Sequence, residues 1–161
     1  NIFLNEHCKD ALTINEFIDK IKITLDDLII TKNKGISEGV SNIFIENMNR
    51  LSLYERPMHC TDIKREKVYI KSNDDGVNPS WKLDIENKEL KEALQKVSIV
   101  QQKNLDKWTK ENPNWQKDSK LQEEYMKLIK NCTDDIEENK RSDKIVKKLC
   151  NKVFVNNKLN N

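Results

Sequence analysis

The sequence predicts an α+β fold that is mostly helical, with about six helices and one central β-hairpin. Apolar residues recur every three or four positions through most of the chain, which is the helical period. One central segment instead alternates apolar and polar residues around a run of turn-forming residues, which is typical of a hairpin. The 161 residues are 36% hydrophobic and 35% charged, which suffices for one modest core. We therefore expect a single domain over residues 1–155, with its hairpin near 67–84, and a frayed tail over 156–161.

Three helices are expected in the N-terminal part of the chain. Residues 13–16 fit the capping-box pattern, in which a threonine and a glutamate exchange hydrogen bonds with backbone amides, so the first helix should begin there. Thr24 marks the start of a second, short helix that should end near Gly35. Ser37 can cap a third helix, which should end before Pro57 because the residue before a proline avoids the helical conformation.

The central segment is expected to form the hairpin. Lys67–Lys71 alternates as a strand, Ser72–Pro79 contains turn-forming residues, and Ser80–Asp84 returns as the partner strand. A lone hairpin is only marginally stable in water. It should therefore pack on the helices or join another strand, for which the extended segment Ile2–Leu4 is a candidate.

The C-terminal part is expected to be helical again. One long helix should run from Asn87 until Pro113 ends it, and Ser119 can cap the next. Residues 134–135 are acidic and should open the last helix, since acidic side chains favour a helix N-terminus. Two indoles should clamp the link between the first two of these helices against the core, Trp108 and Trp115.

Composition and charge exclude some classes of protein. The 29 basic and 27 acidic residues nearly cancel, so net charge gives no argument for nucleic acid or a membrane as a partner. Apolar runs such as Leu28–Ile30 are too short to cross a bilayer. The chain contains 25 Lys but only 4 Arg, which is typical of an AT-rich genome. It begins on Asn1 and shows no signal peptide, so we expect a piece of a longer, intracellular, non-secreted protein.

The four cysteines lack the spacing of a metal-binding motif, and we expect free thiols in a reducing compartment. The two histidines each precede a cysteine, in the pairs 7–8 and 59–60. Zinc needs three or four converging ligands, whereas neighbours on an extended backbone point to opposite sides. A zinc site built from His59, Cys60 and Cys8 is thus a minor alternative, and we expect neither a metal nor a cofactor.

Two catalytic hypotheses concern the polar cluster over residues 59–67. In the first, Asp62 and Glu86 would hold a divalent metal and Lys88 would stabilise the attacked phosphate, as in a metal-dependent nuclease. An acid followed two residues later by a lysine is frequent by chance in a chain this rich in both, so the pattern is weak.

The second catalytic hypothesis has His59 activating the thiol of Cys60 or Cys8. Sequence neighbours rarely reach the geometry of a nucleophile and its base, and no glycine-rich loop that could form an oxyanion hole is evident. We assign no catalytic residue, and we expect a protein that is not an enzyme.

Two groups of cations could contact anions. The first is interleaved with acids, so a solvated surface explains it equally well: Lys64, Arg65, Lys67 and Lys71. The second carries one acid, Asp143, and its spacing places several cations on one helical face: Lys140, Arg141, Lys144, Lys147, Lys148 and Lys152. Binding of this face to a nucleic-acid backbone is one possibility, and a solvated helix is the simpler one.

Residues 56–65 read Arg-Pro-Met-His-Cys-Thr-Asp-Ile-Lys-Arg. This string is the most specific of several stretches that together resemble the C-terminal domain of a multicopy group of giant-virus proteins. The resemblance covers nearly the whole chain, with further matching segments at 3–11, 16–18, 54–66, 69–71, 81 and 88–97. The segment 72–81 is longer here than the corresponding turn of the family.

The resemblance implies a modular protein. Members of the family often look like an N-terminal two-Cys two-His zinc finger, then a coiled-coil or Asn-rich connector, then this domain, and the resemblance implies no catalytic residue. The domain is therefore expected to be a non-enzymatic interaction or oligomerisation module of a giant-virus protein in the infected host, in the viral factory or the virion. Its partner would be a second copy or another viral protein, and a structural protein of the virion is the further alternative.

The residues expected to form a shared surface or local architecture in such a module come from the matching string and the strand after it: Arg56, His59, Asp62, Lys64, Arg65 and Tyr69. A pair between Asp62 and either Arg56 or Arg65 could fasten the entrance of the strand, in which case the string is structural.

Overall fold

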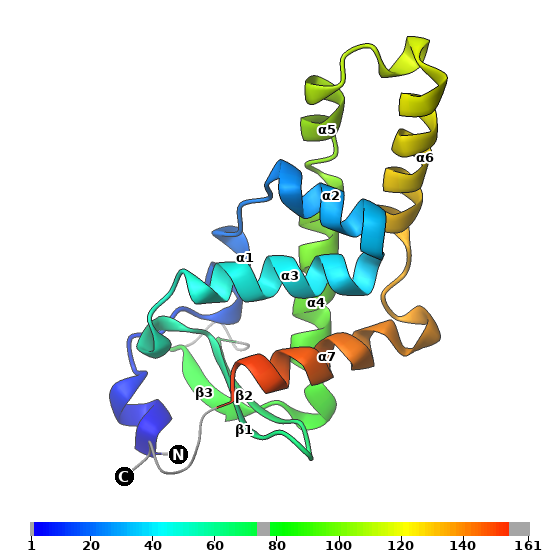
Figure 1. Cartoon of the computed structure of the whole chain (residues 1–161). Helices are drawn as coiled ribbons and strands as arrows, with labels where there is room; N and C mark the ends of the chain where they lie inside the picture. Colours follow the sequence, from blue (N-terminus) through cyan, green and yellow to red (C-terminus); the bar gives the residue numbers. More distant parts are fainter. Residues whose placement is uncertain (1, 74–77, 155–161) are drawn as a thin grey trace.

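The computed structural model describes residues 2–73 and 78–154. Within these ranges the chain forms seven α-helices and a three-stranded antiparallel sheet, the predicted α+β fold with mostly helical content. The sheet lies at one end of the molecule and two helices project at the other (Figure 1). The elements are α1 Ile14–Asp19, α2 Leu25–Lys34, α3 Ile36–Asn49, β1 Met58–Asp62, β2 Lys67–Ser72, β3 Ser80–Leu83, α4 Lys88–Gln102, α5 Asp106–Glu111, α6 Ser119–Thr133 and α7 Arg141–Lys152.

The first two predicted helix starts are confirmed. Thr13 caps α1 and Thr24 caps α2, each through a complete capping box. The prediction that Ser37 caps the third helix is wrong, because α3 begins at Ile36 and its N-cap is Gly35, two residues before Ser37, with φ of +95°. This left-handed backbone suits glycine and lets α2 turn directly into α3. The two helices then pack so closely that a Cβ on Gly39 would lie 1.7 Å from the Thr31 hydroxyl oxygen.

The C-terminal helices differ from the prediction at their ends. The long helix expected from Asn87 is divided into α4 and α5 over residues 103–105, where Asn104 donates its side-chain amide to the Val100 carbonyl (2.8 Å). Such a local bond competes with the helical ladder. The division accounts for seven helices instead of six.

Two further helix starts were wrong. Asp118, rather than Ser119, caps α6, because the Asp118 carboxylate accepts from two backbone amides of the first turn. The acidic residues 134–135 do not open the last helix, since α7 begins at Arg141 after a short 3₁₀ turn. The two indoles do pack at the link as expected, and both rings stack against Tyr125 of α6.

The hairpin prediction is confirmed by β2 and β3, but the third strand is not the expected one. Met58–Asp62 forms β1 beside β2, whereas Phe3–His7 forms a π-helical turn. Of the predicted turn over 72–79, residues 74–77 lie outside the described residues, as does the tail over 156–161.

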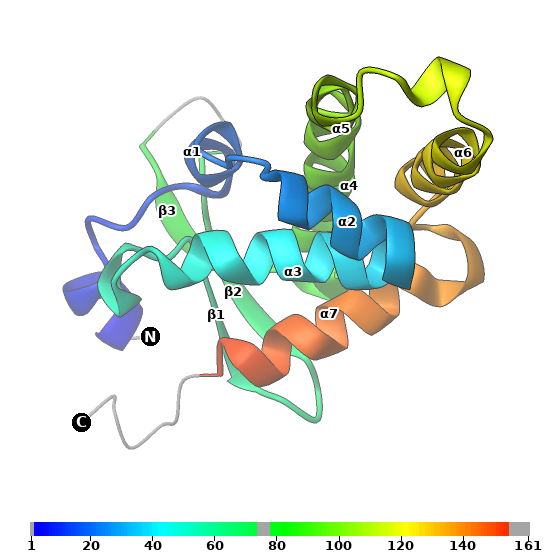
Figure 2. The same ribbon diagram turned by 45° about the horizontal axis from the view of Figure 1, so that its top comes forward.

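The sheet separates two apolar clusters. One face packs against the helices and joins the main core through Met58, Cys60, Val68 and Ile70. The other face is covered by the N-terminal segment, defined here as residues 3–11, in a smaller cluster. Figure 2 shows α3 running beside α2 and α7, whose last turn meets the sheet at β1. Over the described ranges, every helix is too short or too polar to cross a membrane.

Candidate functional site

The side chains of the string over residues 56–65 are divided between the two faces of the sheet. His59 pairs with Tyr69 and points into the small cluster, whereas Cys60 pairs with Val68 and points into the main core. Successive residues of a strand face opposite ways, so this division follows from the backbone. The string therefore does not surround one site.

The side chains on the outer face hold the N-terminal segment by its carbonyl groups. Lys71, which is 8% exposed, donates to the carbonyls of Lys9 (2.6 Å) and Ala11 (2.7 Å). The indole of Trp81 donates to the carbonyl of Cys8 (2.9 Å). Lys71 therefore cannot contribute to the possible anion-contacting patch with Lys64, Arg65 and Lys67, because its ammonium group is occupied by the chain's own backbone.

His59 and Cys8 meet inside this small cluster as neutral groups. The Cys8 sulfur lies 3.7 Å from Nε2 of His59, and the imidazole packs between Phe3 and Trp81. Burial, and secondly the charge of Arg56, lowers the pKa of His59 to about 4. Burial raises the pKa of the Cys8 thiol to about 11, against a smaller opposing effect of Lys71. A thiolate nucleophile needs a lowered thiol pKa, so this pair does not have the electrostatics of an activated cysteine.

Cys60 lies on the other face beside Cys150 of α7, and all four cysteines are free and buried. The hydrogen bond between these two thiols, and secondly burial, raises the pKa of Cys150 above its ordinary value. Cys60 therefore lies in the packing between β1 and α7, apart from both histidines.

The positions of the acidic and metal-ligating side chains do not match the zinc and nuclease hypotheses. In the described part of the chain, no three His, Cys, Asp or Glu side chains gather as metal ligands. Asp62 ends β1 and Glu86 follows β3, so the two carboxylates lie at opposite edges of the sheet, about 10 Å apart or more. Lys88 is exposed at the start of α4. The structure does not bring the proposed nuclease residues together.

Asp62, Lys64 and Arg65 lie around the link between β1 and β2. Asp62 accepts a hydrogen bond from the Arg65 backbone amide (3.1 Å) and forms a loose ion pair with the Arg65 guanidinium (3.9 Å). Of the two predicted partners, Arg65 is the one that pairs with Asp62. Lys64 is exposed, and Tyr69 packs on the small cluster. His59 is 1% exposed and belongs to the local architecture rather than to a surface.

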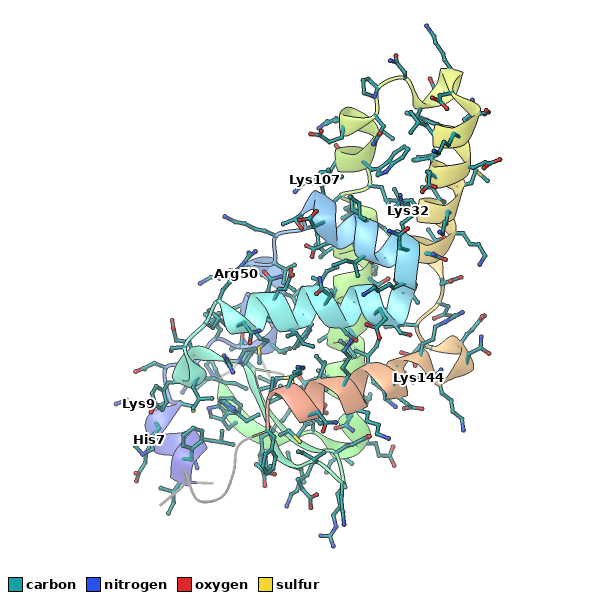
Figure 3. The ribbon with its side chains drawn as sticks, in the orientation of Figure 1. His7, Lys9, Lys32, Arg50, Lys107 and Lys144 are labelled. Atoms are coloured by element: carbon teal, nitrogen blue, oxygen red, sulfur yellow. The ribbon has the colours of Figure 1, made fainter. Side chains whose placement is uncertain are left out.

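The basic run from Arg141 to Lys152 lies on α7, and Lys140 is the N-cap directly before it. Some of its cations have partners within the chain and others do not. Arg141 donates to the Asp135 carbonyl (2.8 Å), and Lys148 pairs with Glu38 of α3 (2.7 Å). The acid of the run, Asp143, is neutralised by Lys91 of α4 (2.7 Å). The exposed cations without an ion pair among the described residues are Lys140, Lys144, Lys147 and Lys152; Figure 3 labels Lys144 on this helix.

The two edges of the sheet differ, which the sequence did not predict. At β1, the outward amide of Cys60 donates to the Val153 carbonyl (3.2 Å), and Cys60 bridges to Phe154. At β3, the Asp84 amide donates to Val68 of β2 (2.9 Å). Because bonding alternates along an antiparallel ladder, the backbone groups of Trp81 and Leu83 point away from β2. No residue of the described ranges bonds them.

An open groove lies beside this free edge. Its volume is about 470 Å³, and it is lined by β3, the start of α4 and the residues between them. Leu83 is 37% exposed and Ile85 is 67% exposed. Two sequence features could have indicated an edge strand: Pro79 directly before it and the charged Lys82 within it.

Comparisons with known proteins add no relative: no family model matches this sequence, nor does any curated protein or solved structure. The likeness to the giant-virus domain therefore remains a prediction.

Proposed function

We propose that this chain is a non-enzymatic interaction module of a giant-virus protein, and that it binds protein chains at the free edge of β3. The observation that carries the proposal is the outward backbone of Trp81 and Leu83, which no described residue bonds, beside the exposed side chains of Leu83 and Ile85. An edge strand with unpaired amides and carbonyls is a template for another strand. Main-chain hydrogen bonds supply affinity in this mode, and neighbouring pockets supply specificity.

The contacts that the polar side chains around the sheet make within the chain support this proposal. Lys71 and Trp81 donate to carbonyls of the N-terminal segment, Nε2 of His59 contacts Cys8 of the same segment, and Cys60 packs in the core. The rigid sheet that results presents its free edge on the outside of the molecule. A binding strand would gain a preorganised partner, since β3 is already held by β2.

A photo-crosslinking experiment tests the proposal without assuming the identity of the partner. The photoreactive residue p-benzoylphenylalanine replaces Ile85 in cells that express the full-length protein, and in a control it replaces Ile99, which is exposed on α4. We expect a discrete protein adduct from position 85, identified by mass spectrometry and lost on Leu83→Pro, which removes an outward amide. Equal adducts from positions 85 and 99, or none at position 85, would overturn the proposal.

A second candidate function is association with a nucleic-acid backbone through α7. The observation that favours it is the ion pair between Lys91 and Asp143, because it cancels the only acid within the helix. The exposed positions 144 and 147 are three residues apart on α7 and share one face. Such a face would bind phosphates without reading sequence.

Fluorescence anisotropy with a short DNA duplex tests this second function. We expect weak binding that falls steeply with salt, and a salt slope reduced by about two units in the double variant Lys144→Gln/Lys147→Gln. The matched control is Lys127→Gln/Lys130→Gln, which removes two exposed lysines of the same spacing from α6. No binding at low salt, or equal slopes in both variants, would exclude α7 as the contact.

A further inference from the structure

We infer that the strand added to β3 is β3 of a second copy of this chain, in an antiparallel arrangement about a two-fold axis at Lys82. This inference rests on the proposed function, because it names the occupant of the same edge. The two sheets would join into one sheet of six strands. A two-fold interface uses the same patch on both copies, so the patch must be complementary to itself.

The backbone of β3 meets this requirement. Its outward groups belong to Trp81 and Leu83, which lie symmetrically on either side of Lys82. In the two-fold arrangement Trp81 of one copy faces Leu83 of the other, and each such pair exchanges two hydrogen bonds. All outward amides and carbonyls of these residues are then satisfied. The indole and the leucine side chain share one face of the sheet, so the facing pairs are also apolar.

The charges at the centre of the arrangement are compatible with it. Two Lys82 side chains would face each other, and like charges directly opposite normally destabilise a sheet. Here each Lys82 already pairs with Glu89 of its own α4 (3.2 Å), so two lysines and two glutamates would meet. A lysine on an edge strand usually discourages pairing. The ion pair with Glu89 weakens that effect.

The length of β3 limits the assembly to a closed dimer. Pro79 precedes the strand and has no amide to donate, and the 3₁₀ turn Ile85–Asn87 follows it. The symmetric pairing over Trp81–Leu83 uses both copies of the edge and leaves none for a third chain. Such a contact is smaller than a standard interface of about 1,600 Å², so we expect a weak, concentration-dependent dimer.

Single cysteine substitutions test the occupant and the register together. In this arrangement Lys82 faces Lys82 in a non-hydrogen-bonded pair, with Cα atoms about 4.5 Å apart, a separation that a disulfide spans. With copper phenanthroline and air as the oxidant, Lys82→Cys should form a disulfide-linked dimer rapidly, because two thiols lose two electrons and two protons. Ile99→Cys is the exposed control and should react at least about tenfold more slowly. The native cysteines are buried and should not interfere.

Light scattering of the unmodified protein completes the test. We expect the molar mass to rise from one chain toward two with concentration, and Leu83→Pro to abolish the rise while keeping the circular dichroism spectrum. A rapid disulfide from Leu83→Cys but not from Lys82→Cys would overturn the register. A monomer at every concentration would overturn the inference. If the protein stays monomeric but position 85 still crosslinks to another protein, the proposed function stands without the dimer. If neither a dimer nor a crosslink is found, the inference and the proposed function both fail.

Discussion

The two edges of the sheet are built from strands of similar length, but they differ in whether another segment of the chain bonds their outward backbone groups. The edge at β1 is covered, because the chain after α7 returns to bond Cys60. The edge at β3 is open, although it also carries outward amides and carbonyls. The covered edge is part of the core, whereas the outward groups of the open edge have no bonding partner among the described residues, and we propose that they bind another strand. The same backbone chemistry is therefore structural at one edge and available for binding at the other.

Proline substitutions should separate the two edges by the largest effect. Cys60→Pro removes the amide that bonds Val153 and should lower the free energy of unfolding by about 3 kcal/mol. Leu83→Pro removes an amide with no partner in the described chain and should cost about 1 kcal/mol or less. Urea unfolding measures both values. Cys60→Ala isolates the loss of the thiol, and equal costs for the two prolines would contradict the difference between the edges.

His59 lies on the face of the sheet that the N-terminal segment covers, and it tests how strongly the stability of that face depends on keeping the imidazole neutral. Its folded pKa of about 4 lies below the ordinary 6.5, so the unfolded chain binds the extra proton first as pH falls. The contribution of His59 should be fully present above pH 6.5 and should decrease by about 3 kcal/mol as the pH falls to 4.

Urea midpoints measured from pH 7 to pH 4 check this dependence. His59→Leu should lose the part of the slope that His59 supplies. His7→Gln should retain it, because His7 is exposed on the N-terminal turn (Figure 3). Identical slopes for the wild type and His59→Leu would show that the imidazole is not held neutral by burial.

Lys71 tests whether the N-terminal segment is a fixed part of the sheet. Lys71→Met leaves the carbonyls of Lys9 and Ala11 without their donor, and should cost about 2 kcal/mol in urea unfolding. The segment should also be cleaved faster in limited proteolysis. Lys67→Met, on the same strand but exposed, should change stability by less than about 0.5 kcal/mol. Equal effects of the two substitutions would mean that the buried ammonium group of Lys71 adds no more to the free energy of unfolding than an exposed lysine does.

Hydrogen exchange compares the edges without any substitution. In dilute protein the Cys60 amide should exchange slowly, whereas the Trp81 and Leu83 amides should exchange nearly as fast as in an unfolded peptide. Raising the concentration should slow the exchange of Trp81 and Leu83 only, since the dimer would pair them. Protection of both amides at high dilution would contradict an open edge in the monomer.

Much of the fold could be predicted because its signals are local. The capping boxes at Thr13 and Thr24 and the alternation of β2 involve residues a few positions apart. The failures occurred where local signals compete, as at Ser119, whose neighbour Asp118 reaches the amides better. The strand β1 was missed because Thr61 is its only residue of a type enriched in strands, and its burial depends on α7, which lies far along the chain.

The candidate site was less predictable than the fold. The string around His59 was identified, but which of its side chains face the core depends on the pairing of β1 with β2. The basic run on α7 was identified as well, but only the structure shows that Lys148 is engaged by Glu38 while Lys144 and Lys147 are not. The free edge of β3 has no sequence signal of its own beyond Pro79 and Lys82.

The sequence by itself determined where helices and the hairpin form, since periodicity and capping act within a few residues. It also predicted that His59 and Cys60 would point to opposite sides if their backbone were extended, because neighbours on a strand diverge. Only the tertiary structure decided that Val153 covers the edge at Cys60 and that nothing in the described chain covers Leu83. These outcomes depend on contacts between residues far apart in the sequence, and such contacts exist only once the core has assembled around them.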